Sequence, residues 1–196
     1  MADKLPKLAV PLAPLLARLD LPADAAQTVQ SASTAADALL RLEAEGFSIE
    51  AVRLSAHALP KREAVWWACM CAASVPDPAL PAADATALLS AEAWVRQPAD
   101  DALRRRAWDA AQATTFKSPE AWAAVAAFWS GGSMAPVGQP AVPPAEGLTG
   151  QAVGGAVMLA AVRGHPQRSA ARLTRFLGAA RDIAAGGAGR LGIEAA

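Results

Sequence analysis

The chain has 196 residues, is 54% apolar, contains no tyrosine, and carries equal numbers of basic and acidic residues, so its formal net charge is zero. This length fits one domain that can bury a sizeable core without disulfide bonds or structural metal ions. Abundant alanine and few β-branched residues favour packed helices over a sheet, and the zero net charge excludes a global attraction to nucleic acid or to an anionic membrane.

Helix signals recur through the first sixty residues. Prolines punctuate residues 1–14, where we expect an extended arm. Beyond it, apolar residues at helical spacing lie between candidate N-caps and closing glycines or prolines. Either Ser31 or Ser33 is the expected cap of one helix, and Ser48 of the next. The predicted helices cover residues 11–19, 31–45 and 48–59, with one added turn at 25–30.

The stretch from Lys61 to Ser74 is the one around which the chain is expected to be organised. No residue from Ala64 to Val75 is charged. Because a helix that is apolar all round is usually buried all round, we predict a central helix with Trp66 and Trp67 inside the protein. Each buried indole then needs an acceptor for its N–H group.

The only cysteines, Cys69 and Cys71, lie two apart on this predicted helix. Their side chains diverge by about 200°, which excludes a disulfide or a shared metal between them. We expect buried, inert thiols in a reducing compartment. Neither His57 nor His165 has a metal-ligand neighbour at helical spacing, so we predict no metal site, and no cofactor motif is present.

The remaining helices are predicted over residues 84–96, 99–115, 119–130, 151–162 and 166–185. Ser118, Pro119 and Glu120 give a cap, a first-position proline and a first-turn acid in order, and Asp84 is the expected cap of the first of these helices. The outer face of the helix over 99–115 is expected to hold Asp100, Asp101, Arg104, Arg105 and Asp109.

Residues 131–150 form a loop rich in proline and glycine, and such a length without structure indicates a linker or a functional loop. Its apolar residues predict that it lies against the surface. The predicted fold is therefore an all-α, single-domain bundle of about seven to nine helices: a helical core over 1–130, the loop over 131–150, and a C-terminal helical pair over 151–196 packed on the core. No apolar run reaches the roughly 18 residues of a membrane span, and we expect a cytoplasmic protein.

A basic stripe is the first candidate site. Arg168, Arg172 and Arg175 recur at i, i+4 and i+7, in a segment (151–196) that carries a charge of +4 against −4 for residues 1–150. The stripe either binds an acidic protein, RNA or phospholipid, or is solvated, or pairs with the acidic part of its own chain. Without a lysine cluster or interleaved aromatic residues, we do not expect nucleic-acid binding.

The run Ser130, Gly131, Gly132 and Ser133, followed by Pro136, is the second candidate. It follows a helix instead of preceding one, so it offers no helix N-terminus to an anion and is expected to be a helix C-cap. We predict that this loop and the arginine stripe together form a protein-binding surface.

A third set, Arg62, Glu63 and His57, is the candidate polar site of an enzyme. A partly buried Glu63 acts as a general acid or base if its pKa is raised. The structural alternative is a carboxylate that pairs with an arginine or with the helix dipole.

Several strings carry a family resemblance: Arg62–Trp67 (REAVWW), Ala127–Pro136 (AFWSGGSMAP), Val142–Pro144 and Leu148–Gly150. They resemble an uncharacterised family of bacterial helical proteins associated with type VI secretion gene clusters, over about residues 39–190. The resemblance implies an accessory protein, an adaptor or chaperone for a spike or effector component, and brings no catalytic residues.

The sequence thus predicts a non-enzymatic protein-binding or scaffold protein whose partner is another protein. Two alternatives stay open. One is an enzyme with a scattered polar site near Glu63. The other is a self-assembling structural protein, a homo-oligomer held by the opposite charges of its two segments.

Overall fold

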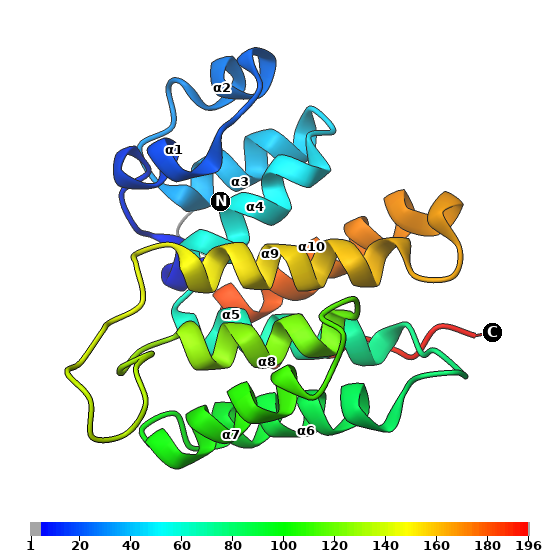
Figure 1. Ribbon diagram of the computed structural model, residues 1–196. Helices are drawn as coiled ribbons and strands as arrows, with labels where there is room; N and C mark the ends of the chain where they lie inside the picture. The colour runs from blue at the N-terminus through cyan, green and yellow to red at the C-terminus, as the bar shows by residue number, and fades with distance from the viewer. Residues whose placement is uncertain (1–4, 196) are drawn as a thin grey trace.

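The computed structural model describes residues 5–195, and the regular elements in this range are all helices, as Figure 1 shows. The elements are η2 (Pro6–Leu8), α1 (Ala13–Leu19), α2 (Ala23–Val29), α3 (Ala35–Ala44), α4 (Ser48–Ala58), α5 (Lys61–Ser74), α6 (Ala82–Arg96), α7 (Asp101–Gln112), α8 (Pro119–Trp129), α9 (Leu148–Val162), η3 (Pro166–Arg168) and α10 (Ser169–Ala184). The all-α prediction is confirmed. Residues 5–195 hold ten α-helices, more than predicted, because the expected turn at 25–30 is the separate helix α2.

The helices are stacked in layers (Figure 1). An antiparallel α6–α7 hairpin covers one side of α8 and α5, and α9 with α10 covers the other. The pair α3–α4, with α1 and α2, packs beyond α9. The helix α9 therefore lies in the middle of the fold, in contact with α4, α5, α8 and α10. Its glycines and alanines permit this close approach from several sides.

The central position predicted for α5 is confirmed for most of its surface. Trp67 is fully buried, and its Nε1–H donates to the carbonyl of Phe176 at 2.8 Å. Trp66 is only half-buried, and its Nε1–H donates to the carbonyl of Ala188 at 2.8 Å. The helix is not buried all round, because the line through Trp66, Met70 and Ala73 is left partly open to solvent.

Both cysteines of α5 are free and fully buried, as predicted. Burial raises the pKa of the Cys69 and Cys71 thiols far above their usual range. The protonated thiols therefore behave as small apolar side chains.

The helix caps agree with the sequence prediction at α8 but not at α3, α4 or α6. Ser118 caps α8, and its Oγ accepts from the backbone N–H of Ala121 at 3.1 Å. The cap of α3 is Thr34 instead of either predicted serine, and α4 has Phe47 at its N-cap position. The prediction that Asp84 is a cap is wrong, because α6 begins two residues earlier. Asp84 is instead buried and accepts from the Ser118 hydroxyl.

Across residues 5–195, every helix is either too short or too polar to cross a bilayer. The same residues bring no three His, Cys, Asp or Glu side chains into a metal-binding group.

Candidate functional site

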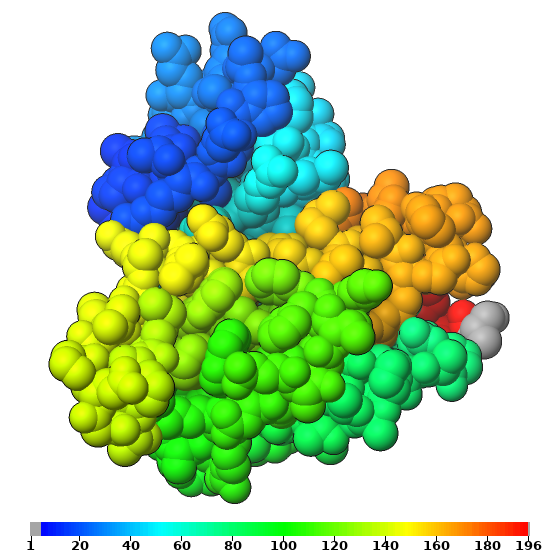
Figure 2. All heavy atoms as spheres, viewed as in Figure 1, coloured from blue at the N-terminus to red at the C-terminus, as the bar shows by residue number. Residues whose placement is uncertain are grey.

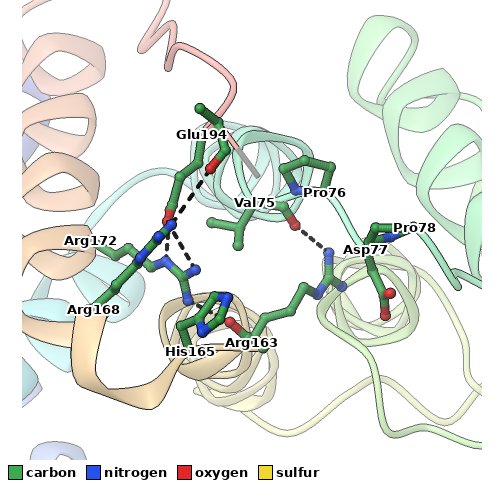
Figure 3. A pocket seen from close by; sticks show the side chains of 11 residues that line it. Val75, Pro76, Asp77, Pro78, Arg163, His165, Arg168, Arg172 and Glu194 are labelled. Atoms are coloured by element: carbon green, nitrogen blue, oxygen red, sulfur yellow. Dashed lines mark hydrogen bonds and ion pairs between the residues drawn. The ribbon is translucent and has the colours of Figure 1, made fainter.

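The arginine cluster, which we define as Arg168, Arg172 and Arg175, does share one face, as its spacing predicts. All three side chains converge on the carboxylate of Glu194, in the C-terminal tail of residues 185–195 (Figure 3 shows the first two). Arg172 binds both carboxylate oxygens, with Nε at 2.7 Å and Nη2 at 3.1 Å. Arg168 Nη1 donates to Oε1 at 2.7 Å, and Arg175 Nη1 lies 3.8 Å from Oε2.

Arg172 is the most buried member of the cluster, with 3% of its surface exposed. Besides Glu194 it binds the carbonyls of Ala161 and Arg163, at 3.0 Å and 2.6 Å, where α9 ends. These carbonyls lie at the negative end of the α9 dipole, which favours a cation. Hydrogen bonds from Arg172 and then Arg168 lower the pKa of Glu194 to about 2, so the carboxylate is ionised at neutral pH.

The stripe therefore pairs within its own chain, but not with the acidic first 150 residues that the charge balance pointed to. The counter-ion belongs to the same C-terminal segment. No pattern in the sequence indicated this partner, because a tail that follows three glycines in four residues (Gly186, Gly187, Gly189) carries no signal of folding back onto α10.

A pocket of about 240 Å³ lies beside the ion pair, and Figure 3 shows its lining. The α5–α6 turn (Val75–Pro78) forms one wall, and the α9–α10 connection forms the other. Arg163 spans the pocket and donates to the carbonyl of Val75 at 2.7 Å. Arg163 also pairs with Glu120, which is 1% exposed at the start of α8. This second ion pair, which the sequence reasoning missed, ties the ends of α5, α8 and α9 together.

The tail is held by its backbone as well as by Glu194. Trp66 donates to the carbonyl of Ala188, and Arg175 Nη2 donates to the carbonyl of Gly192 at 2.6 Å. The N–H of Glu194 donates to the carbonyl of Ser74 at 2.8 Å. Between these points Leu191 packs, partly buried, against the core. The tail is thus bound in an extended form along α5 and α10, as a peptide ligand is bound. We call this surface the tail groove.

The predicted loop surface lies elsewhere. The loop between α8 and α9 begins at Ser130 as a helix C-cap, as expected, and α9 starts at Leu148, three residues before its predicted start. Arg104 binds the carbonyls of Phe128 and Ser133, each at 2.8 Å, and Arg105 binds the carbonyl of Ala135 at 3.0 Å. The prediction that Arg104 lies on the outer face of its helix is wrong: it is 4% exposed, because it anchors this loop.

Beyond the contacts with Arg104 and Arg105, the loop is held by hydrogen bonds between its own residues. The Ser133 Oγ accepts from the N–H groups of Ala135 and Val142, at 3.1 Å and 3.0 Å. Gly132 allows the turn, because it has a φ of +63° at a place where a side chain would collide with Arg104. Pro136 and the tip are exposed, with Val137 at 82%, so the tip does not lie against the surface as predicted (Figure 2, lower left).

The loop and the arginine cluster are not one surface. The loop enters α9 at Leu148, whereas Arg172 binds the carbonyls at the opposite end of that helix. A helix of 15 residues is about 22 Å long, so α9 holds the two candidate regions apart.

The residues of the candidate polar site, Arg62, Glu63 and His57, do not lie together either. Glu63 pairs with Lys7 at 3.1 Å and lies 3.9 Å from Arg62, whose Nε donates to the carbonyl of Val95. His57 lies in a different pocket, with Arg18 and Arg53, against the flank of α9. Glu63 thus has the ion-paired environment of the structural alternative, and His57 does not reach it.

His57 packs directly on α9, where Gly150 has no side chain. A Cβ at position 150 would come within 2.5 Å of the imidazole, so glycine is what lets the two helices meet. Burial, and then the nearby Arg18 guanidinium, lower the pKa of His57, so the ring is neutral at pH 7.

A comparison with known protein families gives one match. A model of a family of unknown function, DUF6931, matches residues 38–184, and the chain belongs to this family. No curated protein matches the chain, and no solved structure does. The resemblance to an uncharacterised family is thereby confirmed. The matched segment contains the arginine cluster and ends where the tail begins.

Proposed function

We propose that this protein is a non-enzymatic accessory protein, an adaptor or chaperone, that binds another protein through its arginine cluster. One observation carries the proposal: three arginines of the family segment converge on a single carboxylate that comes from outside that segment. Arginine is the residue best suited to bind carboxylates in this bidentate geometry.

The rest of the described surface supports binding over catalysis. The carboxylate of Glu63 is already paired with Lys7, and the two thiols of α5 are fully buried. His57 and Glu63 lie in separate pockets, so no acid–base pair is assembled from the predicted polar residues.

The experiment is affinity capture of the tagged full-length protein from the cells that encode it, with mild cross-linking. Arg168 and Arg175 are partly exposed, at 45% and 38% of their side chains, so both can be changed to Glu without burying a charge. We expect Arg168→Glu/Arg175→Glu to lose the captured partner. Arg53→Glu/Arg106→Glu makes the same charge change on exposed arginines of α4 and α7, and should keep it.

Loss of the partner from both variants, or from neither, contradicts the proposal. Circular dichroism of each variant checks that the helices remain. Arg172 is left unchanged because a carboxylate in its buried position would disrupt the fold itself.

We propose further, from the sequence resemblance alone, that the protein is bacterial, acts in the cytoplasm and serves a type VI secretion system. What supports this is the set of strings around Trp66 and Ser130. The identity of the captured partner tests it: a spike or effector component is expected, and a partner from an unrelated pathway contradicts it.

A further inference from the structure

We propose that the tail groove is a peptide-binding groove for an extended acidic segment of another protein, and that the chain's own tail occupies it as a competitor. This inference rests on the proposed protein-binding function and names its site and its ligand. The ligand is a segment in which an apolar residue is followed, three residues later, by Glu or Asp, as Leu191 is followed by Glu194.

The groove has the parts that recognise an extended peptide. Trp66 and Arg175 donate to backbone carbonyls of the tail, and the carbonyl of Ser74 accepts a backbone N–H. Such contacts bind a main chain of any sequence, so specificity comes from side-chain positions. Two side-chain positions of the bound peptide determine specificity. One is the partly buried position of Leu191, and the other is the position of the Glu194 carboxylate.

The groove favours an anion, because Arg172 donates two hydrogen bonds to the Glu194 carboxylate and is covered when the tail is bound. If the tail left without a replacement, this guanidinium would keep only two carbonyl partners and would have no carboxylate. Loss of the tail would also expose Arg172 to water and remove two charge-assisted hydrogen bonds. The lining of the neighbouring pocket would then hold Arg163, Arg168 and Arg172 with Asp77 as its single acid. The emptied groove, with three arginines and one acid, therefore favours binding of another carboxylate.

A partner segment is a better occupant than the tail of a second copy. The chain's own tail is attached directly to α10, at an effective concentration of about millimolar. An identical tail from another copy gains no contact that would offset this advantage. A partner can gain one, because Arg175 is 38% exposed and its closest tail contact is the carbonyl of Gly192. A second acid at that place would add an ion pair.

The test uses the full-length protein and a fluorescein-labelled peptide with the sequence of residues 186–196 (GGAGRLGIEAA), followed by fluorescence anisotropy. Glu194→Gln in the protein weakens its own tail, so we expect it to bind the peptide about tenfold or more tightly than the wild type does. The same peptide with Glu194→Gln should bind at least tenfold more weakly. A peptide with Gly192→Glu should bind several-fold more tightly.

Two matched variants locate the binding. In the Glu194→Gln background, Arg168→Glu/Arg175→Glu should abolish peptide binding, and Arg53→Glu/Arg106→Glu should leave it unchanged. The inference is overturned if the Glu194→Gln protein does not bind the labelled peptide, or binds the Glu and Gln peptides equally. It is also overturned if the wild type forms a concentration-dependent dimer that Glu194→Gln abolishes, because the occupant is then a second copy.

The two proposals fail separately. Absence of peptide binding, with capture of a partner that still depends on Arg168 and Arg175, removes the tail groove and leaves the adaptor function. Capture that ignores these arginines removes the adaptor function on this surface, whatever the peptide does.

Discussion

Replacing Glu194 with Gln tests how much the ion pair between Glu194 and Arg172 contributes to the free energy of unfolding. The change removes the charge that faces Arg172 and keeps the size and hydrogen-bonding capacity of the side chain. Glu194 is 15% exposed and Arg172 is 4% exposed, so solvent screens the pair in part. The substitution therefore leaves a buried guanidinium without its carboxylate.

Two physical arguments set the magnitude. Hydrogen bonds to a charged group contribute about 1.5–3 kcal/mol each. The fall of the Glu194 pKa from 4.5 to about 2 corresponds to about 3 kcal/mol of preference for the ionised form, which is an upper limit because the pocket is open on one side. Glutamine retains part of the hydrogen bonding. We expect Glu194→Gln to lower the free energy of unfolding by about 2 kcal/mol at pH 7.

The pH dependence follows from the sign of the shift. Because the folded-state pKa lies below the unfolded value, the contribution is fully present above about pH 5 and declines as the pH falls from 4.5 towards 2. More than half of it should be gone by about pH 3. The difference between the wild type and Glu194→Gln should therefore shrink at low pH.

The measurement is urea denaturation followed by circular dichroism, at about pH 7 and about pH 3, with Glu45→Gln at the exposed end of α3 as the control. Hydrogen exchange at the Glu194 amide, which donates to Ser74, separates local opening of the tail from global unfolding. The ion pair does not contribute as described if the free energies of unfolding of the wild type and Glu194→Gln differ by less than about 0.5 kcal/mol at pH 7. The same holds if this difference is equal at both pH values.

Three further outcomes are expected. Glu120→Gln breaks the buried ion pair with Arg163 and should lower the free energy of unfolding by about 3 kcal/mol in the same denaturation assay. A loss below about 1 kcal/mol would mean that the pair is solvated. Gly150→Ala forces a methyl group into the His57 ring and should cost about 1–3 kcal/mol, most of which should be recovered in the double variant with His57→Ala. Arg104→Met removes the loop anchor and should speed cleavage of the loop by a broad-specificity protease, and an unchanged cleavage rate would contradict the anchoring role.

Local structure follows from the amino-acid sequence alone. The helix-forming residues after Pro60 make α5 a helix, and the cap at Ser118 sets the start of α8, because propensity and capping act between residues close in the chain. The spacing of Arg168, Arg172 and Arg175 placed them on one face for the same reason.

Where those faces point, and what covers them, depends on how the helices pack together. Arg104 and Arg172 have the spacing of surface residues, yet both are buried, because backbone carbonyls from distant parts of the chain accept their hydrogen bonds. The partner of Arg172 is 22 residues away, in a tail without a helical pattern of its own. The length of α9 separates the loop from the arginine cluster, which no local pattern could indicate. An ion pair between segments depends on the packing of whole helices, and that packing is settled only when the core forms.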